Sequence, residues 1–443
     1  GDDTNSAGSG SVYIYKRGDG ADNDWTLEAT LNRSSDGITE FGRCIALSGN
    51  GGSWAALRDG AYREGVTIPS DDKKVLAVSG KGADGKHNRI SMYLRSHTGV
   101  WTLRNTIVVP DDYNGTFPTS VDFGDVRGIN CLSLSDDGFV LAAGIRHSWG
   151  STSNIQANKG RVEAYYSTSG PWLNSTRLSA IPDIVSDAYG ASSWAGTSVA
   201  LSGDGNTLTI GVPKIEYLSD GSSDNTIPAS LRAEIMTIGL WVQNSGGGFM
   251  TPSHRYVVDS YHRTGIGFNV DVSYDGRMIA AGGVRKSADN SLDDKGVVQI
   301  LERQTIDITT LLGATAAEFT LTSEVTAPDA EDHDFFGTDV KLDMPAPTIL
   351  NYPTGGTLIV GAKNRNTRQG AAYVFTNRLP TPEVALSTSH TWIHQKTIIG
   401  SQAESGTSIN PVTGVEYPFD FQIRNTGSQF GLSVDIDGLY AVV

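Results

Sequence analysis

The sequence is poor in several residue types, and each shortage excludes a class of protein. Only 2 of its 443 residues are cysteine, which excludes a disulfide-rich scaffold, and 5 methionines against 52 glycines do not make a helix-rich composition. No apolar run approaches the roughly 18 residues that would cross a bilayer. Lysine and arginine number 34 against 49 acidic residues, which gives a formal net charge of −15. This excess of negative charge argues against a surface that binds the phosphates of a nucleic acid. It favours solubility, cation-rich surroundings or a basic partner.

One pattern recurs six times along the chain. Each copy has an FG-like start, a short alternating stretch, a turn that usually contains Asp-Gly, and a small-residue apolar strand that ends near glycine. The copies begin at Phe41, Ile129, Ala195, Gly267, Phe336 and Phe430. Alternation of apolar and polar residues around an Asp-Gly turn predicts a β-hairpin, which gives strands one and two of a repeating unit.

Two further strands are predicted after each hairpin. The third is a short stretch such as GRVEAYYS or GAAYVFTNR. The fourth begins with an aromatic residue, at Trp25, Trp101, Trp172, Phe319 and Trp392, with Phe249 as a weaker counterpart. A period of roughly 70 residues with four strands and no helical periodicity predicts an all-β, six-bladed β-propeller, with seven blades as the alternative. The equivalent places of the tryptophans indicate blade packing rather than sugar stacking.

The two ends of the chain complete one repeat between them. The sixth copy stops at Val443 after two inner strands, and the chain begins with an unpartnered third strand. We therefore expect residues 430–443 and residues from about 10 to about 32 to share one blade, which closes the ring. The whole chain, residues 1–443, is then a single domain, with insertions near residues 49–72 and 378–427.

The clearest copy is AGTSVALSGDGNTLTIGVP, which begins at Ala195. It resembles the FG-GAP repeats of integrin α-subunit heads and of many secreted bacterial and algal proteins, especially the variant FGxSVALSGDGxTLAVGA. Only the copies at Phe336 and Phe430 keep both the Phe-Gly pair and the following valine, so the six-fold recurrence carries the resemblance. We expect the glycines of these two pairs, Gly337 and Gly431, to be architectural rather than ligand-binding, because they recur where the chain enters the crowded innermost strand. The resemblance implies a secreted or cell-surface repeat protein with a role in cell adhesion or in a structural assembly.

Integrin-type repeats often carry a calcium loop patterned DxDxDG in the first hairpin. None of the six turns here supplies three alternating acidic residues, so Asp136, Asp137, Asp204 and Asp275 are interpreted as turn residues. Solvated loop charge is favoured over a weak exposed cation site for the other acidic clusters, Asp2-Asp3, Asp111-Asp112, Asp293-Asp294 and Glu331-Asp332-His333-Asp334. We therefore expect no metal site and no cofactor. The alternative is a weak loop site, and calcium is the cation that such a site would bind.

No catalytic constellation is evident in the sequence. There is no G-x-S-x-G elbow before a helix. His390 and His394 would lie roughly 13 Å apart on one strand, too far apart to share a metal easily. Cys44 and Cys131 hold equivalent places in adjacent repeats, where their side chains point in the same rotational sense. We therefore expect two buried thiols rather than a disulfide.

These features predict a non-catalytic extracellular binding or structural module, secreted or on the cell surface, either by itself or as part of a larger chain or assembly. It meets a protein or glycan partner through its propeller loops, binds no nucleic acid and does not insert into a membrane. Three N-x-S/T sequons, at Asn32, Asn114 and Asn174, are candidate glycosylation sites. The alternative is an enzyme or a glycan-binding lectin with its site at the propeller axis. An integrin-like calcium-stabilised adhesion head is disfavoured because the calcium loops are missing.

The turns lead to a prediction about calcium. Because no hairpin turn has enough carboxylates to offset the dehydration of the cation, millimolar calcium added to chelator-treated protein should leave the melting temperature nearly unchanged. Differential scanning calorimetry measures this directly. A large rise in melting temperature would contradict the interpretation of these aspartates as turn residues.

Overall fold

The computed structural model describes residues 8–17, 25–49, 74–96, 98–110, 128–145, 160–167, 172, 175–178, 194–213, 234–241, 248–249, 254–257, 265–284, 294–303, 319–344, 356–365, 369–378, 391–399, 404–409, 416–421, 434–437 and 440–442. The chain divides into two compact units, each of which is described by itself. Unit 1 is Gly1–Gly205 with Leu240–Phe249, and unit 2 is Asn206–Gly239 with Met250–Val443. Within the described ranges, no helix is long and apolar enough to cross a membrane.

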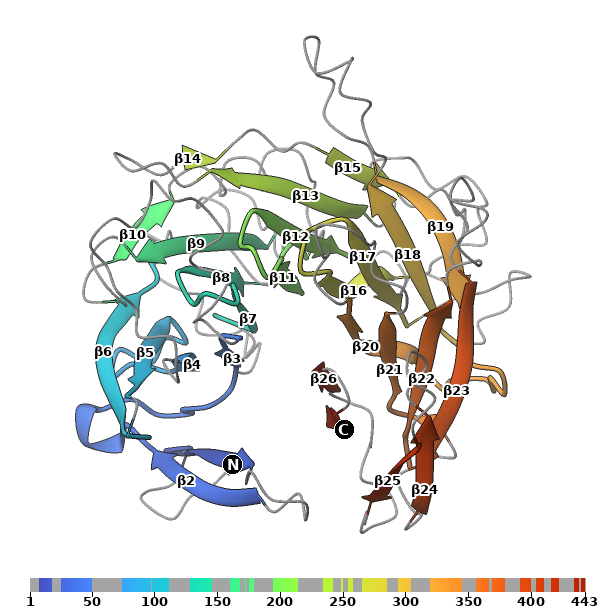
Figure 1. Cartoon of the computed structure of the whole chain (residues 1–443). Helices are drawn as coiled ribbons and strands as arrows, with labels where there is room; N and C mark the ends of the chain where they lie inside the picture. Colours follow the sequence, from blue (N-terminus) through green and yellow to red (C-terminus); the bar gives the residue numbers. More distant parts are fainter. Residues whose placement is uncertain are drawn as a thin grey trace, which may run out of the picture. The chain divides into compact units, whose positions relative to one another are not determined.

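Unit 1 contains two four-stranded antiparallel sheets whose strands follow one another in chain order (Figure 1). The first consists of β3 (Ile45–Leu47), β4 (Val75–Gly80), β5 (Arg89–Arg95) and β6 (Trp101–Val108). The second consists of β7 (Cys131–Leu134), β8 (Val140–Ile145), β9 (Arg161–Ser167) and β10 (Ser175–Leu178). The unit also holds the hairpin β1 (Val12–Arg17) and β2 (Trp25–Leu31), the strand β11 (Val199–Leu201) and the short β14 (Gly248–Phe249).

Unit 2 repeats the same arrangement. One sheet consists of β16 (Ile266–Val272), β17 (Met278–Gly283), β18 (Val297–Arg303) and β19 (Phe319–Val325). The next consists of β20 (Phe336–Asp343), β21 (Thr357–Ala362), β22 (Ala371–Arg378) and β23 (Thr391–Ile399). Strand β13 (Glu234–Trp241) pairs with β12 (Thr207–Val212) and with β15 (His254–Val257). The last two residues of β13 belong to unit 1. The hairpins β24 (Glu404–Ile409) with β25 (Glu416–Phe421), and β26 (Asp435–Asp437) with β27 (Tyr440–Val442), complete the unit.

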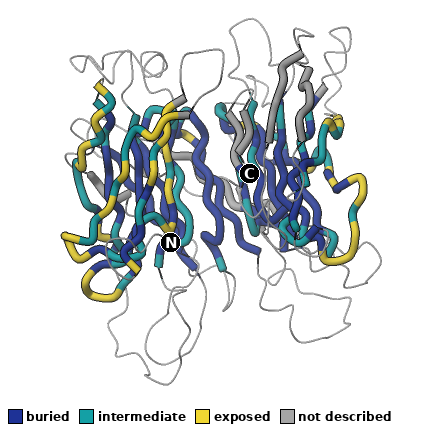
Figure 2. Tube along the Cα trace, turned by 90° about the horizontal axis from the view of Figure 1, so that it is seen from below, coloured by how far each residue is buried: buried dark blue, intermediate teal, exposed yellow. Residues whose placement is uncertain are grey.

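Three of the second strands, β4, β8 and β17, are buried along their whole length. Figure 2 draws the buried stretches of the chain in dark blue. These strands read VLAVSG, VLAAGI and MIAAGG, which are apolar on both faces and small enough for two sheets to approach closely. One core cluster joins the two sheets of unit 1 through residues such as Ile90 and Leu141, and another joins those of unit 2 through residues such as Ile300 and Phe336. Blades therefore cover each other, as a propeller requires.

Four of the described fourth strands, β2, β6, β19 and β23, carry a bulge at the same place, whereas β10 pairs with β9 without a register shift. The pairing skips one residue, which is Glu28, Arg104, Thr322 and Gln395 respectively. A bulge changes which side chains face the neighbouring sheet and increases the local twist. At the first of these bulges, Glu28 accepts hydrogen bonds from Arg95 Nε at 2.9 Å and from Trp101 Nε1 at 2.9 Å. The Arg95 hydrogen bond is the main reason that the pKa of Glu28 falls to about 2.

The N-terminal hairpin β1–β2 lies against the sheet β3–β6. Val12 shares a core cluster with Phe41 and Leu76, and the residues before β1 bond to the start of the next repeat. Glu40 N–H donates to Gly8 O at 2.7 Å, and Phe41 N–H donates to Ser9 O at 3.1 Å. In unit 2, Phe336 N–H donates to Lys295 O before β18 in the same manner, at 3.0 Å. The hairpin β1–β2 thus has the position of strands three and four of a preceding blade.

Four complete four-stranded blades are present in the described part of the chain, which makes this an all-β propeller fold. The six-blade count, the FG-GAP type and the single domain with a closing blade shared by residues 430–443 and 10–32 stay predictions. Strand β23 pairs with β22 up to Ile399, and the hairpin β24–β25 follows it within the second expected insertion. The first expected insertion lies almost entirely outside the described residues.

The glycine at the FG position of the repeat has a left-handed backbone conformation in four of the copies. Its φ is +94° at Gly42, +78° at Gly196, +88° at Gly267 and +87° at Gly337. A Cβ added at Gly337 would lie 2.8 Å from Val297 O and 3.1 Å from Gly283 N. Both the backbone angle and the space therefore require glycine, which supports the architectural role predicted for Gly337. Gly431, the corresponding glycine of the last copy, lies outside the described residues.

We predict that Gly337→Ala lowers the free energy of unfolding by at least about 1 kcal/mol. Urea unfolding followed by circular dichroism measures the loss. Gly85→Ala is the matched control, because Gly85 has a φ of +76° but no heavy atom within 4 Å of an added Cβ. The loss at Gly337 should exceed the loss at Gly85, since only Gly337 adds a steric clash to the strained backbone. Equal losses would show that packing at Gly337 contributes nothing.

Candidate functional site

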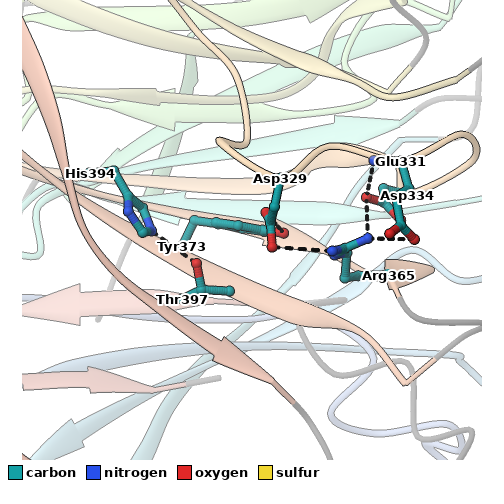
Figure 3. Close-up of polar contacts among 7 residues, drawn as sticks. All are labelled: Asp329, Glu331, Asp334, Arg365, Tyr373, His394 and Thr397. Carbon is teal, nitrogen blue, oxygen red and sulfur yellow. Dashed lines mark hydrogen bonds and ion pairs between the residues drawn. The ribbon is translucent and has the colours of Figure 1, made fainter.

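Three chain segments of unit 2 meet around Arg365, at one end of the sheet β20–β23. The loop between β19 and β20 supplies Asp329, Glu331 and Asp334, and the segment after β21 supplies Arg365 itself. Strand β22 supplies Tyr373. Figure 3 shows the guanidinium of Arg365 surrounded by the three carboxylates. We call these five residues the Arg365 cluster.

Arg365 forms ion pairs with all three carboxylates. Its Nη1 lies 2.7 Å from Glu331 Oε2 and 3.4 Å from Asp334 Oδ2, and its Nη2 lies 3.1 Å from Asp329 Oδ2. The loop also closes on itself, because Glu331 N–H donates to Asp334 Oδ2 at 2.8 Å. Tyr373 adds a hydrogen bond from its hydroxyl to Asp329 Oδ1 at 2.9 Å. The β19–β20 loop is thus fixed to two neighbouring segments by charged hydrogen bonds.

Burial and charge act in opposite directions in this cluster. Burial raises the pKa of Asp334, whose side chain is 3% exposed, while the Glu331 N–H group and Arg365 partly offset the rise. Burial alone would lower the pKa of Arg365, but Asp334, Tyr373, Asp329 and Glu331 outweigh it and raise the pKa. Burial, followed by the hydrogen bond to Asp329, raises the pKa of Tyr373. Arg365 therefore stays charged and acts as an internal counter-ion for the loop.

The backbone beside the cluster is strained at three non-glycine residues. Asp294, His333 and Phe335 have φ values of +46°, +66° and +54°. Hydrogen bonds hold this conformation, since Phe335 N–H donates to Asp294 O at 3.1 Å and Thr338 Oγ1 donates to Phe335 O at 2.6 Å. Residues in such conformations persist only where the surroundings over-determine them, and they concentrate at functional sites.

The inner side of the cluster is aromatic. Tyr373 packs edge-on against Phe336 with ring centroids 5.3 Å apart, and the His394 ring lies 6.1 Å from the Tyr373 ring. His394 Nε2 lies 2.9 Å from Thr397 Oγ1. Asp329 accepts its hydrogen bond from the Tyr373 hydroxyl, whereas the His394 ring contacts Thr397, as Figure 3 shows. This order of contacts differs from the hydroxyl–imidazole–carboxylate order of a nucleophilic site.

The sequence interpretation of the Glu331–Asp334 cluster as solvated loop charge needs correction. Asp334 is buried and Arg365 neutralises it, whereas the side chains of Glu331 and Asp332 are 67% and 68% exposed. Arg365 and Tyr373 were missed because their partners lie 31 to 44 residues away in the chain. The one available signal was an arginine in a polar loop that follows a buried strand. Asp2, Asp3, Asp111, Asp112 and Asp293 lie outside the described residues.

The hairpin aspartates are turn residues, as predicted. Asp137 Oδ1 accepts hydrogen bonds from Phe139 N–H at 3.0 Å and from Ser135 Oγ at 2.6 Å. Asp275 and Asp204 accept bonds from the serine two residues before them, Ser273 at 2.8 Å and Ser202 at 2.6 Å. Asp136 instead donates its backbone N–H to Gly203 O at 3.0 Å. No group of three or more potential metal ligands forms among the residues that the structure covers, and the absence of a metal site stays a prediction.

Cys44 and Cys131 are free thiols, and only Cys44 is fully buried. Burial raises the pKa of the Cys44 thiol. Each sulfur contacts a carbonyl of the following repeat, Cys44 Sγ with Ile129 O at 3.7 Å and Cys131 Sγ with Gly196 O at 3.5 Å. Their equivalent places therefore give equivalent contacts, but Cys131 is half-buried rather than buried as expected.

The tryptophans differ more than their equivalent places in the sequence predicted. Trp172 is 1% exposed and donates Nε1–H to Gly138 O at 2.7 Å, but it lies in a turn with a φ of +58°, ahead of β10. Trp101 begins β6 and bonds to Glu28, and Trp392 packs against the core of unit 2. These contacts support a structural role. The side chain of Trp25 lies outside the described residues.

Of the candidate glycosylation sites, Asn32 is exposed and follows β2. Asn114, Asn174 and His390 lie outside the described residues.

No family model matches the sequence, and no curated protein matches it. Solved structures that align with the chain include Sqt1 from Chaetomium thermophilum, at 12% identity and a TM-score of 0.39, over 83% of this chain and 63% of that one. The Cps50 (Swd1) β-propeller domain from Myceliophteria thermophila aligns at 8% identity and a TM-score of 0.35, over 79% and 94% of the two chains. An intramolecular trans-sialidase from Ruminococcus gnavus aligns at 9% identity and a TM-score of 0.41, over 84% and 87%. The chain thus spans less than two thirds of the length of Sqt1, and none of these likenesses bears on function.

We predict that Arg365→Met lowers the free energy of unfolding by about 3 kcal/mol, because it leaves the buried Asp334 without its counter-ion. Denaturant unfolding measures the change. His333→Gln is the control in the same loop: its side chain is 64% exposed, so loss of its contact with Asp294 should change stability by less than about 1 kcal/mol. A fully stable Arg365→Met variant would show that the cluster does not hold the loop.

Proposed function

We propose that this chain is a non-catalytic extracellular binding or structural module, and that the β19–β20 loop is one of its contact surfaces. The observation that carries the proposal is the combination of a fixed loop base with exposed charges at its tip. Arg365 holds Asp334 in the interior, while Glu331, Asp332 and His333 are each more than 60% exposed. A side chain displayed on a fixed backbone loses little conformational entropy when it binds.

The charge of the chain indicates the chemistry of the partner. The formal net charge is −15, and the loop tip adds local negative charge from Glu331 and Asp332. Such a surface favours a protein partner with lysine and arginine side chains, through faster encounter and complementary contacts. The exposed sequon at Asn32 fits a secreted or cell-surface location, because a glycan needs an accessible asparagine.

The experiment uses the intact chain, immobilised and probed with purified basic extracellular-matrix proteins by biolayer interferometry and with a glycan array. For the partner that binds, we predict that the double variant Glu331→Gln/Asp332→Asn lowers the affinity at least about tenfold. The matched control is Asp36→Asn/Asp84→Asn, which removes two exposed charges from unit 1 and should leave the affinity unchanged.

Two outcomes would count against the proposal. Binding that is insensitive to both double variants would remove the β19–β20 loop as a contact surface. Turnover of fluorogenic glycosides by the chain would favour the enzyme alternative over a binding module.

A further inference from the structure

Phe335 has a backbone conformation that a glycine adopts at the same place in another repeat. Its φ is +54°, and its carbonyl accepts a hydrogen bond from Thr338 N–H at 3.2 Å. In the preceding repeat of unit 2, Gly265 has a φ of +61° and accepts the same bond from Phe268 N–H at 3.1 Å. The turn therefore forms without a side chain, whereas a phenylalanine in it strains the backbone. Residues strained in this way concentrate at functional sites, so the ring rather than the turn accounts for phenylalanine here.

The ring of Phe335 lies outside the core cluster that contains its neighbour. Phe336 is fully buried and belongs to that cluster, whereas Phe335 is half-buried. The Phe335 ring instead contacts a cation, because Lys363 Nζ lies over it at 5.5 Å from its centroid. The negative π face of the ring attracts an ammonium group at that distance. The ring thus already binds one cation, which the chain itself supplies.

Two exposed carboxylates belong to the same loop as the ring. The side chains of Glu331 and Asp332 are 67% and 68% exposed. A second lysine of the chain lies close to one of them, with Lys295 Nζ 3.6 Å from Asp332 Oδ1. Contacts of this kind between exposed groups are weak. A cation from a partner can therefore replace Lys363 on Phe335 and Lys295 on Asp332.

We propose that Phe335 is the anchor of the β19–β20 contact surface, and that its ring binds a lysine or arginine side chain of the partner in place of Lys363. This inference rests on the proposed function, because it assumes that the partner meets this loop. The exposed carboxylates attract the basic segment, and the π face of the ring holds one of its cations. Arginine is the better ligand, since its planar guanidinium also stacks on the ring.

Fluorescence anisotropy of the intact chain with labelled hexa-arginine tests the anchor. We predict that Phe335→Leu lowers the affinity about fivefold, the effect of losing one cation–π contact, although the net charge is unchanged. Lys363→Met should raise the affinity more in the wild-type chain than in Phe335→Leu, because only an intact ring gains a vacant face. The matched control is Tyr15→Leu, which removes a ring that is 54% exposed in unit 1 and should leave the affinity unchanged.

Phe335→Gly separates a contact role from a structural one. Glycine relieves the backbone strain, as Gly265 does in its own repeat, so the urea midpoint should stay equal or rise while the affinity falls. A midpoint that falls together with the affinity would show that the ring is a packing residue, and would overturn the proposal.

The double variant Glu331→Gln/Asp332→Asn distinguishes failure of the anchor from failure of the contact surface. If this variant loses affinity for hexa-arginine and Phe335→Leu does not, the loop remains a contact surface and Phe335 is not its anchor. If neither variant loses affinity, or if hexa-arginine does not bind at all, both the contact surface and the anchor are wrong.

Discussion

The close approach of one repeat's backbone to the next is the constraint on which the rest of the structure depends. Gly144 in β8 abuts the carbonyl of Gly196, and Gly282 in β17 abuts the carbonyl of Gly337, so no side chain fits at either place. Once the backbones are this close, short side chains such as Ser133, Asn269 and Asp271 can reach the free N–H groups of the next first strand. Glycine thus sets the spacing between neighbouring repeats of a unit. This short spacing allows the polar side chains of one repeat to bond to the backbone of the next.

Features that depend on neighbouring residues could be predicted from the sequence. The hairpins follow from alternation around Asp-Gly, and Asp137 and Asp275 act within their own turns. The glycine of the FG pair could be predicted because its recurrence coincides with a chain entering the innermost strand. In each case the physical cause lies within a few residues, so one copy of the repeat contains the whole interaction.

Features that depend on contacts between distant residues could not be predicted. The partners of Arg365 in the candidate site lie 31 to 36 residues away, and Glu28 and Arg95 are separated by 67 residues. The local sequence does not distinguish an arginine that neutralises a buried aspartate from an arginine that points into solvent. Trp172 shows the same limit, since its place in the repeat indicated a strand and the Gly138 carbonyl holds it in a turn instead.

The bulges of the fourth strands affect how two molecules could meet. A fourth strand such as β6 or β23 is the outer edge of its sheet, with backbone groups that a strand from another molecule could pair with. The skipped residue, Arg104 in β6 and Gln395 in β23, interrupts the straight row of donors and acceptors along that edge. The row is interrupted at the same point in β6, β19 and β23, whereas β10 pairs with β9 without a register shift. Sheet growth between copies through β6, β19 and β23 is therefore disfavoured, and the propeller could reach high local concentrations without joining through these strands.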